Sequence, residues 1–156
     1  MKSLKELYRI GIGPSSSHTM GPRNAAEQFL AKHPDAKSFE VTLYGSLAAT
    51  GKGHMTDTAI IDTLEPHAPL DLKWEPEIFL PFHPNGMLFK SKDENGKVTD
   101  EWTVFSVGGG ALAEEGIDNS ASPDIYEMTK MSQILGWCER TGRSYWEYVE
   151  QCEDKD

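Results

Sequence analysis

The alternation of apolar and polar positions in the first half of the chain predicts a helix, a strand and a second helix. Residues 21–35 carry apolar side chains at helical spacing along one face, as in a helix that packs on a core. In residues 37–46 every second position is apolar, which is typical of a strand. The next apolar face predicts a helix over 57–65, capped by Thr56 or Asp57. The glycine-punctuated stretch between the strand and this helix is expected to be a loop.

The second half of the chain predicts three consecutive strands. The runs typical of strands, with the turn signals between them, are 75–84, Asn85-Gly86, 87–92, Asn95-Gly96 and 100–110. The proline-containing residues 66–75 are expected to connect the second helix to the first of these strands. Two further helical pieces, separated at Gly142, are expected within 124–151.

The order of helix, strand, helix and three strands (α-β-α-β-β-β) is typical of the α+β class. Because consecutive hairpins pair neighbouring strands antiparallel, we expect a two-layer fold in which one mixed, mostly antiparallel sheet carries its helices on one face. The chain has 156 residues, a length that suits one domain with a sizeable core. We therefore expect a single domain over residues 1–156.

The composition excludes several classes of partner. The formal net charge is −10, whereas nucleic acids and anionic membranes are bound by clustered Lys and Arg. No apolar run approaches the length of a membrane span, and the first residues lack the apolar core of a signal peptide. We therefore expect no nucleic-acid or membrane partner, and two cysteines, which give no disulfide framework, make a reducing cytoplasm the expected location. The only cysteines, Cys138 and Cys152, cannot supply the four thiolates that an iron–sulfur cluster usually takes.

The sequence GIGPSSSHT, residues 11–19, combines the parts of an anion-binding loop. Its glycines expose backbone N–H groups, a helix begins directly afterwards, and four side chains add hydroxyl donors: Ser15, Ser16, Ser17 and Thr19. His18 adds a group that titrates near neutral pH. A polar loop whose Ser or Thr only caps the helix would give the same pattern, so the spacing alone leaves both interpretations open.

A second glycine-rich stretch, YGSLAATGKGHMTD over residues 44–57, follows the first predicted strand. Its glycines let the backbone approach a ligand closely, Lys52 adds positive charge, and His54 stands just before the next helix. The stretch lacks the G-K-[ST] ending of a phosphate-binding P-loop. Scattered His and Asp residues are a weak metal signal, so no metal ligand is assigned. An ordinary loop histidine is the alternative for His54.

Four segments in this order, GIGPSSSHTMGP, YGSLAATGKGHMTD, HPNGM and FSVGGGA, resemble the β domain of the iron–sulfur-dependent L-serine dehydratases, also called L-serine ammonia-lyases. The resemblance covers nearly the whole chain and is densest in residues 10–23 and 44–62. Arg23, Pro84 and Ala111 depart from residues that are common in that family. The cluster-bearing α domain of the family is absent from this sequence, so the chain resembles either a separate β subunit or an excised N-terminal domain.

The resemblance implies a reaction and a site. Members of the family convert L-serine to pyruvate and ammonia without pyridoxal phosphate, using a [4Fe-4S] cluster that the α domain, and not this chain, would hold. By that resemblance His18 and His54 are the candidates for proton transfer, since a neutral imidazole suits general-base chemistry near pH 7. Which of them is the base stays open. The candidates for binding the substrate L-serine are Ser15, Ser16, Ser17, Thr19, Lys52, Asn85, Gly108 and Gly109.

Three functions stay open at this point. In the first, the chain supplies part of a catalytic site that the α domain, fused or separate, completes within a homo-oligomer. In the second, the chain is a regulatory module that binds an amino acid or an anion, because its fold is also similar to the allosteric substrate-binding domain of some phosphoglycerate dehydrogenases. The third is a bare scaffold, which is disfavoured because packing alone would not require two glycine-rich polar loops.

Overall fold

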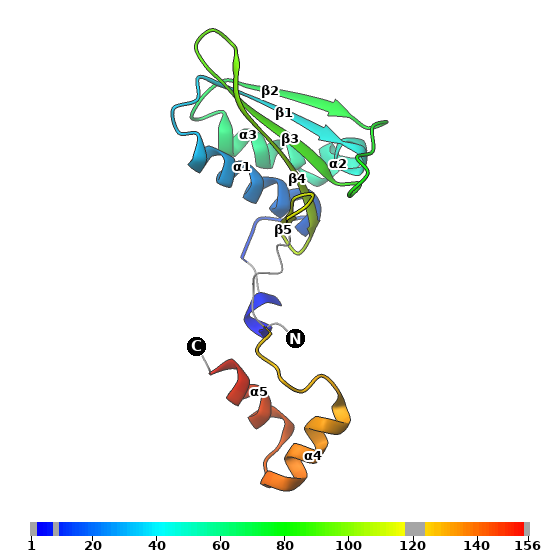
Figure 1. The fold of residues 1–156 in the computed structure, drawn as a ribbon. Coiled ribbons are helices and arrows are strands. Elements are labelled where there is room, and N and C mark those ends of the chain that lie inside the picture. The colour runs from blue at the N-terminus through cyan, green and yellow to red at the C-terminus, as the bar shows by residue number, and fades with distance from the viewer. Residues whose placement is uncertain (1–2, 8–9, 118–123, 155–156) are drawn as a thin grey trace. The chain divides into compact units, whose positions relative to one another are not determined.

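The computed structural model describes residues 3–7, 10–117 and 124–154 of the chain. Its contacts group into two compact units, one formed by Ile10–Asn119 and the other by Met1–Arg9 with Ser120–Asp156. We call the first the sheet unit and the second the helical unit; Figure 1 shows the elements of both. Every candidate site residue named from the sequence lies in the sheet unit.

The sheet unit is a two-layer α+β fold, as the sequence predicts. Its five described strands pair in the order β2-β1-β3-β4-β5, with β1 and β2 parallel and the other neighbours antiparallel. Helices α1 and α3 lie on one face of this sheet (Figure 1). The elements in chain order are η2 (Ser16–Met20), α1 (Gly21–Lys32), β1 (Ser38–Tyr44), α2 (Gly45–Thr50), η3 (Gly51–His54), α3 (Thr56–Leu64), β2 (Leu70–Glu75), β3 (Gly86–Lys92), β4 (Val98–Gly108) and β5 (Ala111–Ala113).

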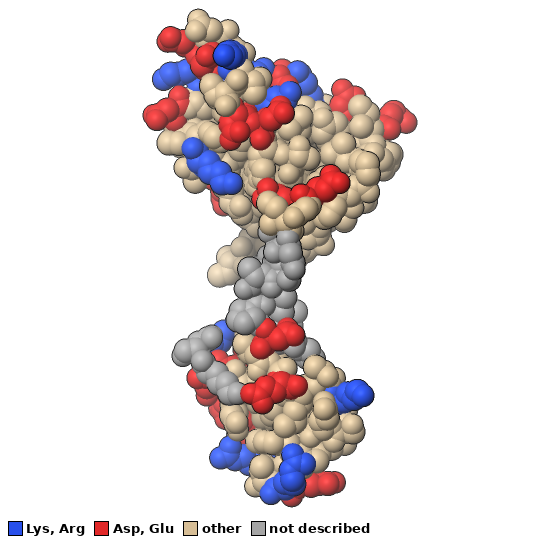
Figure 2. Space-filling view, in the orientation of Figure 1, with Lys and Arg blue, Asp and Glu red and all other residues tan. Residues whose placement is uncertain are grey.

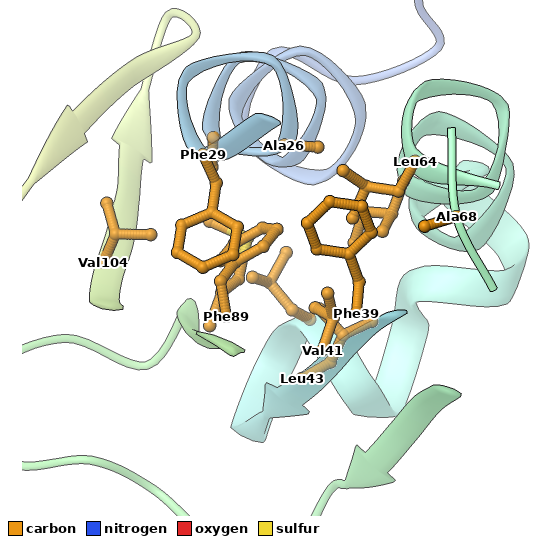
Figure 3. Packing of buried hydrophobic residues seen from close by; sticks show 13 residues of the cluster. Ala26, Phe29, Phe39, Val41, Leu43, Leu64, Ala68, Phe89 and Val104 are labelled. Atoms are coloured by element: carbon orange, nitrogen blue, oxygen red, sulfur yellow. The ribbon is translucent and has the colours of Figure 1, made fainter. Parts of the chain in front are cut away.

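The core lies between the sheet and helices α1 and α3. Phe29 of α1 packs against Phe89 of β3 with ring centroids 5.5 Å apart, and against Phe39 of β1 at 6.2 Å. Figure 3 shows these rings among the aliphatic side chains of β1 and α3. The members of this core with no exposed surface are Ala25, Ala26, Phe29, Val41, Leu43, Leu47, Ile60, Leu64, Met87, Phe89 and Val104. Burial of apolar surface stabilises a fold by about 25 cal/mol per Å². The core therefore holds the strands in place, and the candidate site extends from their ends.

The opposite face of the sheet is polar. The side chain of Glu40 in β1 is only 11% exposed there, and it accepts a hydrogen bond from Lys92 Nζ at 2.6 Å and pairs with Lys73 Nζ at 2.9 Å. Hydrogen bonds from Lys92 and then Lys73 lower the pKa of the Glu40 carboxyl to about 2. Acidic and basic side chains are interspersed on the visible surface of the sheet unit rather than gathered by sign (Figure 2).

The first strand after α3 lies where the sequence predicts a connector. β2 occupies the end of the segment 66–75, and its burial alternates, with Leu70, Leu72 and Trp74 half-buried between exposed neighbours. The prolines of the segment precede the strand, where they remove no hydrogen bond of the sheet. The connector prediction is therefore wrong for these residues, because β2 runs parallel to β1 at the edge of the sheet.

The residues that follow β2 are irregular, and the strand predicted over 75–84 is wrong. Three prolines in this segment cannot donate hydrogen bonds to a sheet. The turn predicted at Asn85-Gly86 is also wrong, because β3 begins at Gly86. The turn predicted at Asn95-Gly96 is confirmed: Gly96 has a φ of +75°, and its N–H donates to Asp93 O at 3.0 Å.

The described part of the helical unit contains η1 (Leu4–Leu7), α4 (Met131–Thr141) and α5 (Tyr145–Glu153). The predicted break at Gly142 is confirmed, since this glycine ends α4 in a left-handed conformation with a φ of +68°. Tyr126, Ile134, Tyr148 and Cys152 form a small core of their own. Among the helices that the structure describes, none has both the length and the apolar character needed to cross a bilayer.

Candidate proton-transfer site

The first glycine-rich motif forms a turn of π-helix rather than the predicted polar loop. This turn, η2, runs directly into α1, and Ser15 caps it: Ser15 Oγ accepts a hydrogen bond from His18 N at 3.1 Å. The carbonyl of Ser15 accepts from Thr19 N and Met20 N, each at 3.1 Å. Single π-helical turns are frequent at functional sites, so the conformation of η2 is consistent with a functional role for this motif.

The second motif is helical, so the loop prediction for it is wrong. Gly45 begins α2 with a φ of +47°, and a Cβ at this position would lie 2.7 Å from Pro84 O. Glycine therefore lets the chain turn from β1 into a helix against a neighbouring backbone. α2 continues into η3, which ends at His54, and Met55 then takes a left-handed conformation with a φ of 58°. α3 starts after it without the predicted side-chain cap.

The two motifs bring the imidazole rings of His18 and His54 together. The ring centroids lie 5.0 Å apart, and the ring planes are tilted by 43°. His54 Nδ1 lies 3.0 Å from Thr50 O. Because a carbonyl oxygen only accepts hydrogen bonds, the proton of neutral His54 sits on Nδ1 and Nε2 carries the lone pair.

His18 has a hydroxyl partner at each ring nitrogen. Nδ1 lies 2.9 Å from Ser17 Oγ, and Nε2 lies 3.2 Å from Ser46 Oγ. Burial lowers the pKa of His18 below its ordinary value and the neighbouring His54 lowers it further, while a hydrogen bond with Ser46 partly opposes both. The lowered pKa of His18 favours the neutral imidazole, the form that accepts or relays a proton.

Ser46 is a residue of this site that the sequence reasoning missed. Its Oγ faces His18 at 3.2 Å, and its N–H donates to Pro84 O at 3.1 Å, which holds the start of α2 in place. The signal that could have found it is positional. Ser46 stands at the carboxyl end of β1, directly after a glycine with positive φ, where a strand turns into a helix.

Strand β4 supports the first motif from the sheet. Ser106 has no exposed surface, and its Oγ donates to Ser17 O at 2.7 Å. A Cβ at Gly21 would lie 2.1 Å from Ser106 Oγ, so glycine at the start of α1 makes this contact possible. Asn85 Nδ2 donates to Ser106 O at 3.2 Å. The side-chain amide of Asn85, a predicted substrate-binding residue, is thus hydrogen-bonded within the sheet.

Two buried threonines join the motifs. Thr19 Oγ1 donates to His54 O at 2.6 Å, and Thr56 Oγ1 donates to His18 O. Thr19 is predicted to bind substrate, but it is 3% exposed and its hydroxyl also accepts from Ser15 N at 3.2 Å. Its hydroxyl thus already donates and accepts within the protein.

The other predicted substrate-binding residues lie around this centre. Ser16 is exposed on η2. Lys52, exposed on η3, places its Nζ 5.4 Å from the ring centroid of Trp74. Gly108 and Gly109 turn β4 toward β5 with φ values of +103° and +59°, and a Cβ at either would meet open space. The structure thus gives Lys52 an aromatic contact and leaves the glycine turn accessible.

A cleft of about 420 Å³ lies at the other end of α1. It is lined by residues 32–37, 91–94 and Thr99, and neither candidate histidine is among them. α1 has 12 residues, and a helix of that length spans roughly 18 Å, so the cleft and the histidine pair are separate features. Among the described residues, no group of three or more His, Cys, Asp and Glu side chains could hold a metal ion.

Two imidazoles tied to hydroxyl and carbonyl partners define a candidate acid–base site on an α+β scaffold. The sequence also matches the family model described as serine dehydratase beta chain, over residues 3–75 and 67–117. The chain therefore belongs to the serine dehydratase beta chain family, as its resemblance predicts. Both motifs and both histidines lie within the matched residues.

Curated relatives bear the corresponding name. The chain is 38% identical to an L-serine dehydratase of Mycobacterium bovis over 152 residues, which cover 72% of this chain and 33% of the relative. It is 31% identical to L-serine dehydratase TdcG of Escherichia coli over an alignment of 189 residues, which covers 92% of this chain and 41% of the relative. For an L-serine dehydratase of Helicobacter pylori the identity is 29% over an alignment of 190 residues, which covers 94% of this chain and 42% of the relative. The chain thus spans about a third to two-fifths of the length of these relatives.

Proposed function

We propose that this chain supplies part of the site of an L-serine dehydratase, in which His18 and His54 act on L-serine and a second part of the enzyme completes the site. Membership of the serine dehydratase beta chain family supports the proposal, as do relatives named L-serine dehydratase. The single observation that carries it is the 5.0 Å separation of the two imidazole rings. At this separation both rings can contact one small amino acid.

His54 is the proposed general base. Thr50 O holds the Nδ1 proton, so Nε2 presents a lone pair when the ring is neutral. In the proposed reaction Nε2 takes the α-proton of L-serine and returns it to the departing β-hydroxyl, which leaves as water and yields 2-aminoacrylate. Hydrolysis of this enamine then gives pyruvate and ammonia.

His18 is proposed to orient the substrate, because its ring nitrogens already face the hydroxyls of Ser17 and Ser46. The substrate carboxylate is proposed to lie against η2, where hydroxyl groups gather on Ser15, Ser16 and Ser17. Ser15 Oγ accepts from His18 N and keeps its O–H to donate. The positive end of the η2–α1 helical run favours an anion at this place.

The resemblance implies a [4Fe-4S] cluster, and the residues of this chain do not fit one. Cys138 lies in α4 and Cys152 in α5, which leaves two thiols where a cluster usually takes four. We propose that the cluster is held by an α domain, fused or separate, which is the partner of this chain. Within that enzyme, the contribution of this chain is substrate binding and proton transfer.

The cleft at the other end of α1 favours a second candidate function, a regulatory module that binds an amino acid or an anion. Both signs of charge line this cleft, as the carboxylate and ammonium groups of an amino acid would require; the charged side chains are Lys32, Asp35, Lys37, Lys92, Asp93 and Glu94. In that case the isolated chain would bind its ligand without His18 and His54, which do not line the cleft.

Calorimetric titration of the folded chain with L-serine distinguishes the two candidates. The proposal predicts no saturable heat, because the isolated chain holds only part of the site. Saturable binding that Lys37→Ala removes and His18→Ala preserves would establish the regulatory module instead. Binding that only His18→Ala removes would place serine at η2, with this chain holding more of the site than proposed.

A further inference from the structure

The candidate histidines are joined through their backbones by two threonines. In one motif Thr19 directly follows His18, and in the other Thr56 follows His54 by two residues. Thr19 Oγ1 donates to His54 O at 2.6 Å, and Thr56 Oγ1 donates to His18 O. Each threonine therefore binds the carbonyl of the histidine in the other motif. We call this reciprocal pair of hydrogen bonds the threonine clamp.

Both hydroxyls of the threonine clamp are shielded from water. Thr19 is 3% exposed and Thr56 is 0% exposed. Because a buried polar group without a partner is unfavourable, the two motifs favour the one register that satisfies both bonds. Gly51 makes room for this arrangement, since a Cβ there would lie 3.1 Å from Thr56 Oγ1 and 2.9 Å from the Trp74 ring.

The threonine clamp acts on the histidine backbones, and separate contacts orient the rings. Ser17 and Ser46 hold the ring of His18, and Thr50 O holds the ring of His54. With the two backbones fixed to each other and each ring fixed on its own side, the 5.0 Å ring separation follows. Such a separation matters because a misplacement of about 1 Å can lower a catalysed rate about 100-fold.

We propose that Thr19 and Thr56 are positioning residues, whose reciprocal hydrogen bonds hold η2 and η3 in the register at which His18 and His54 can act on one substrate. The catalytic consequence rests on the proposed function, whereas the structural consequence concerns the chain by itself. The two threonines act through the histidine backbones and not on the substrate.

The chain offers a matched set of variants for this test. Thr56→Val keeps the shape of the side chain and removes the hydroxyl, whereas Thr56→Ser keeps the hydroxyl and removes the methyl group. Thr63→Val is the control, because Thr63 Oγ1 donates to Ala59 O at 2.8 Å within the same helix and does not join the two motifs. Thr19→Val removes the other bond of the clamp.

Nuclear Overhauser contacts between the ring protons of His18 and His54 report the ring separation in the isolated chain. Wild type, Thr56→Ser and Thr63→Val are expected to show the cross-peak, and Thr56→Val is expected to lose it. The pKa of His18 should then rise toward its ordinary value, because burial and His54 both lower it. Retention of the cross-peak and of the wild-type His18 titration in folded Thr56→Val would overturn the proposal. If Thr56→Val does not fold, Thr19→Val carries the same expectations.

Turnover in the completed enzyme separates this inference from the proposed function. Thr56→Val is expected to lower kcat about tenfold or more, with KM changed by less than about threefold, and Thr56→Ser to restore it. Loss of the cross-peak with unchanged turnover would support the structural role of the threonine clamp and refute the catalytic role of the histidine pair. Lowered turnover with an intact cross-peak would refute the positioning role of Thr56.

Discussion

The two ends of helix α1 differ in what their polar groups do. At the amino-terminal end, the hydroxyls of Thr19, Thr56 and Ser106 bind backbone carbonyls of other segments, and all three side chains are buried. These bonds lie outside the regular ladders of helices and strands. Their joint effect is to fix η2 against η3 and β4, and with them the imidazoles of His18 and His54.

At the carboxyl-terminal end a cleft of about 420 Å³ opens, lined by residues 32–37, 91–94 and Thr99. Lys92, which lines the cleft, donates to Glu40 at 2.6 Å. His33 packs on Phe29 with ring centroids 4.5 Å apart, and its Nε2 lies 3.0 Å from Asp100 Oδ2 without the alignment of a hydrogen bond. No second histidine lines the cleft.

Under the proposed function, the chemistry lies at the amino-terminal end of α1 and not at the cleft. The amino-terminal end is marked by buried hydrogen bonds that join distant segments, which are costly to leave unsatisfied. A site that a second part of an enzyme completes has no need to form an enclosed pocket by itself. We therefore base the proposed function on the histidine pair and not on the cleft.

The largest expected effect comes from removing a histidine at one end of α1 and not at the other. In the completed enzyme of the proposed function, His54→Ala should lower kcat by about 100-fold or more, as expected for loss of the proposed general base. His33→Gln, at the other end, should change kcat by less than about twofold. Rates of pyruvate formation measure the kcat of both variants. An equal decrease in kcat for His54→Ala and His33→Gln would contradict the difference between the two ends of α1.

The contact between η2–α1 and β4 should be sensitive to a single methyl group. Gly21→Ala places a Cβ 2.1 Å from Ser106 Oγ, so the free energy of unfolding should fall by about 1–3 kcal/mol. Gly53→Ala is the control, since its Cβ would meet nothing within 4 Å, and it should be neutral or stabilising by up to about 1 kcal/mol. Urea unfolding measures both, and the account fails if the two variants are destabilised alike.

The ion pairs of Glu40 should make stability depend on pH. The pKa of Glu40 is lowered from 4.5 to about 2, so ionised Glu40 stabilises the fold above pH 4.5, and this stabilisation disappears as the pH falls through about 2. Glu40→Gln should cost about 1–2 kcal/mol at pH 7, less than the full shift implies because the lysines are partly exposed. A difference between wild type and variant that persists unchanged near pH 2 would contradict this assignment.

The smallest effect is expected from substitutions in the cleft. Lys37→Ala and Glu94→Ala should change the serine concentration that gives half-maximal turnover by less than about twofold, because the proposed site lies elsewhere. Steady-state rates at varied L-serine concentration measure this. A large change with kcat unaltered would favour the regulatory function for the carboxyl-terminal end of α1.

Elements with strong local periodicity could be predicted from the sequence. α1, β1 and α3 follow their apolar patterns, and the strands β3 and β4 lie close to the predicted runs. β2 was missed because its existence depends on parallel pairing with β1, a non-local contact. The opposite error concerns the segment 75–84, where a strand is predicted and none forms. Its apolar residues alternate as in a strand, but its prolines exclude sheet pairing.

The candidate site could be predicted only in part. His18 and His54 stand in unusual motifs and were named from them, whereas Ser46, Thr56 and Ser106 acquire their roles from partners 28 to 89 residues away. No local pattern encodes such a bond. The helical form of both motifs was missed for a related reason, because glycines that usually signal a loop here make room for neighbouring chain atoms, as at Gly45.

The proposed role of the histidine pair is tested by adding this chain in increasing amounts to a fixed amount of the separately prepared, anaerobically reconstituted α domain and measuring the pyruvate formed from L-serine. We expect no pyruvate from the chain alone, a rate that rises and saturates as the wild-type chain is added, and no turnover with the folded double variant His18→Ala/His54→Ala. That variant should still compete with the wild-type chain for the α domain. A double variant that supports turnover as well as the wild type does would contradict the account.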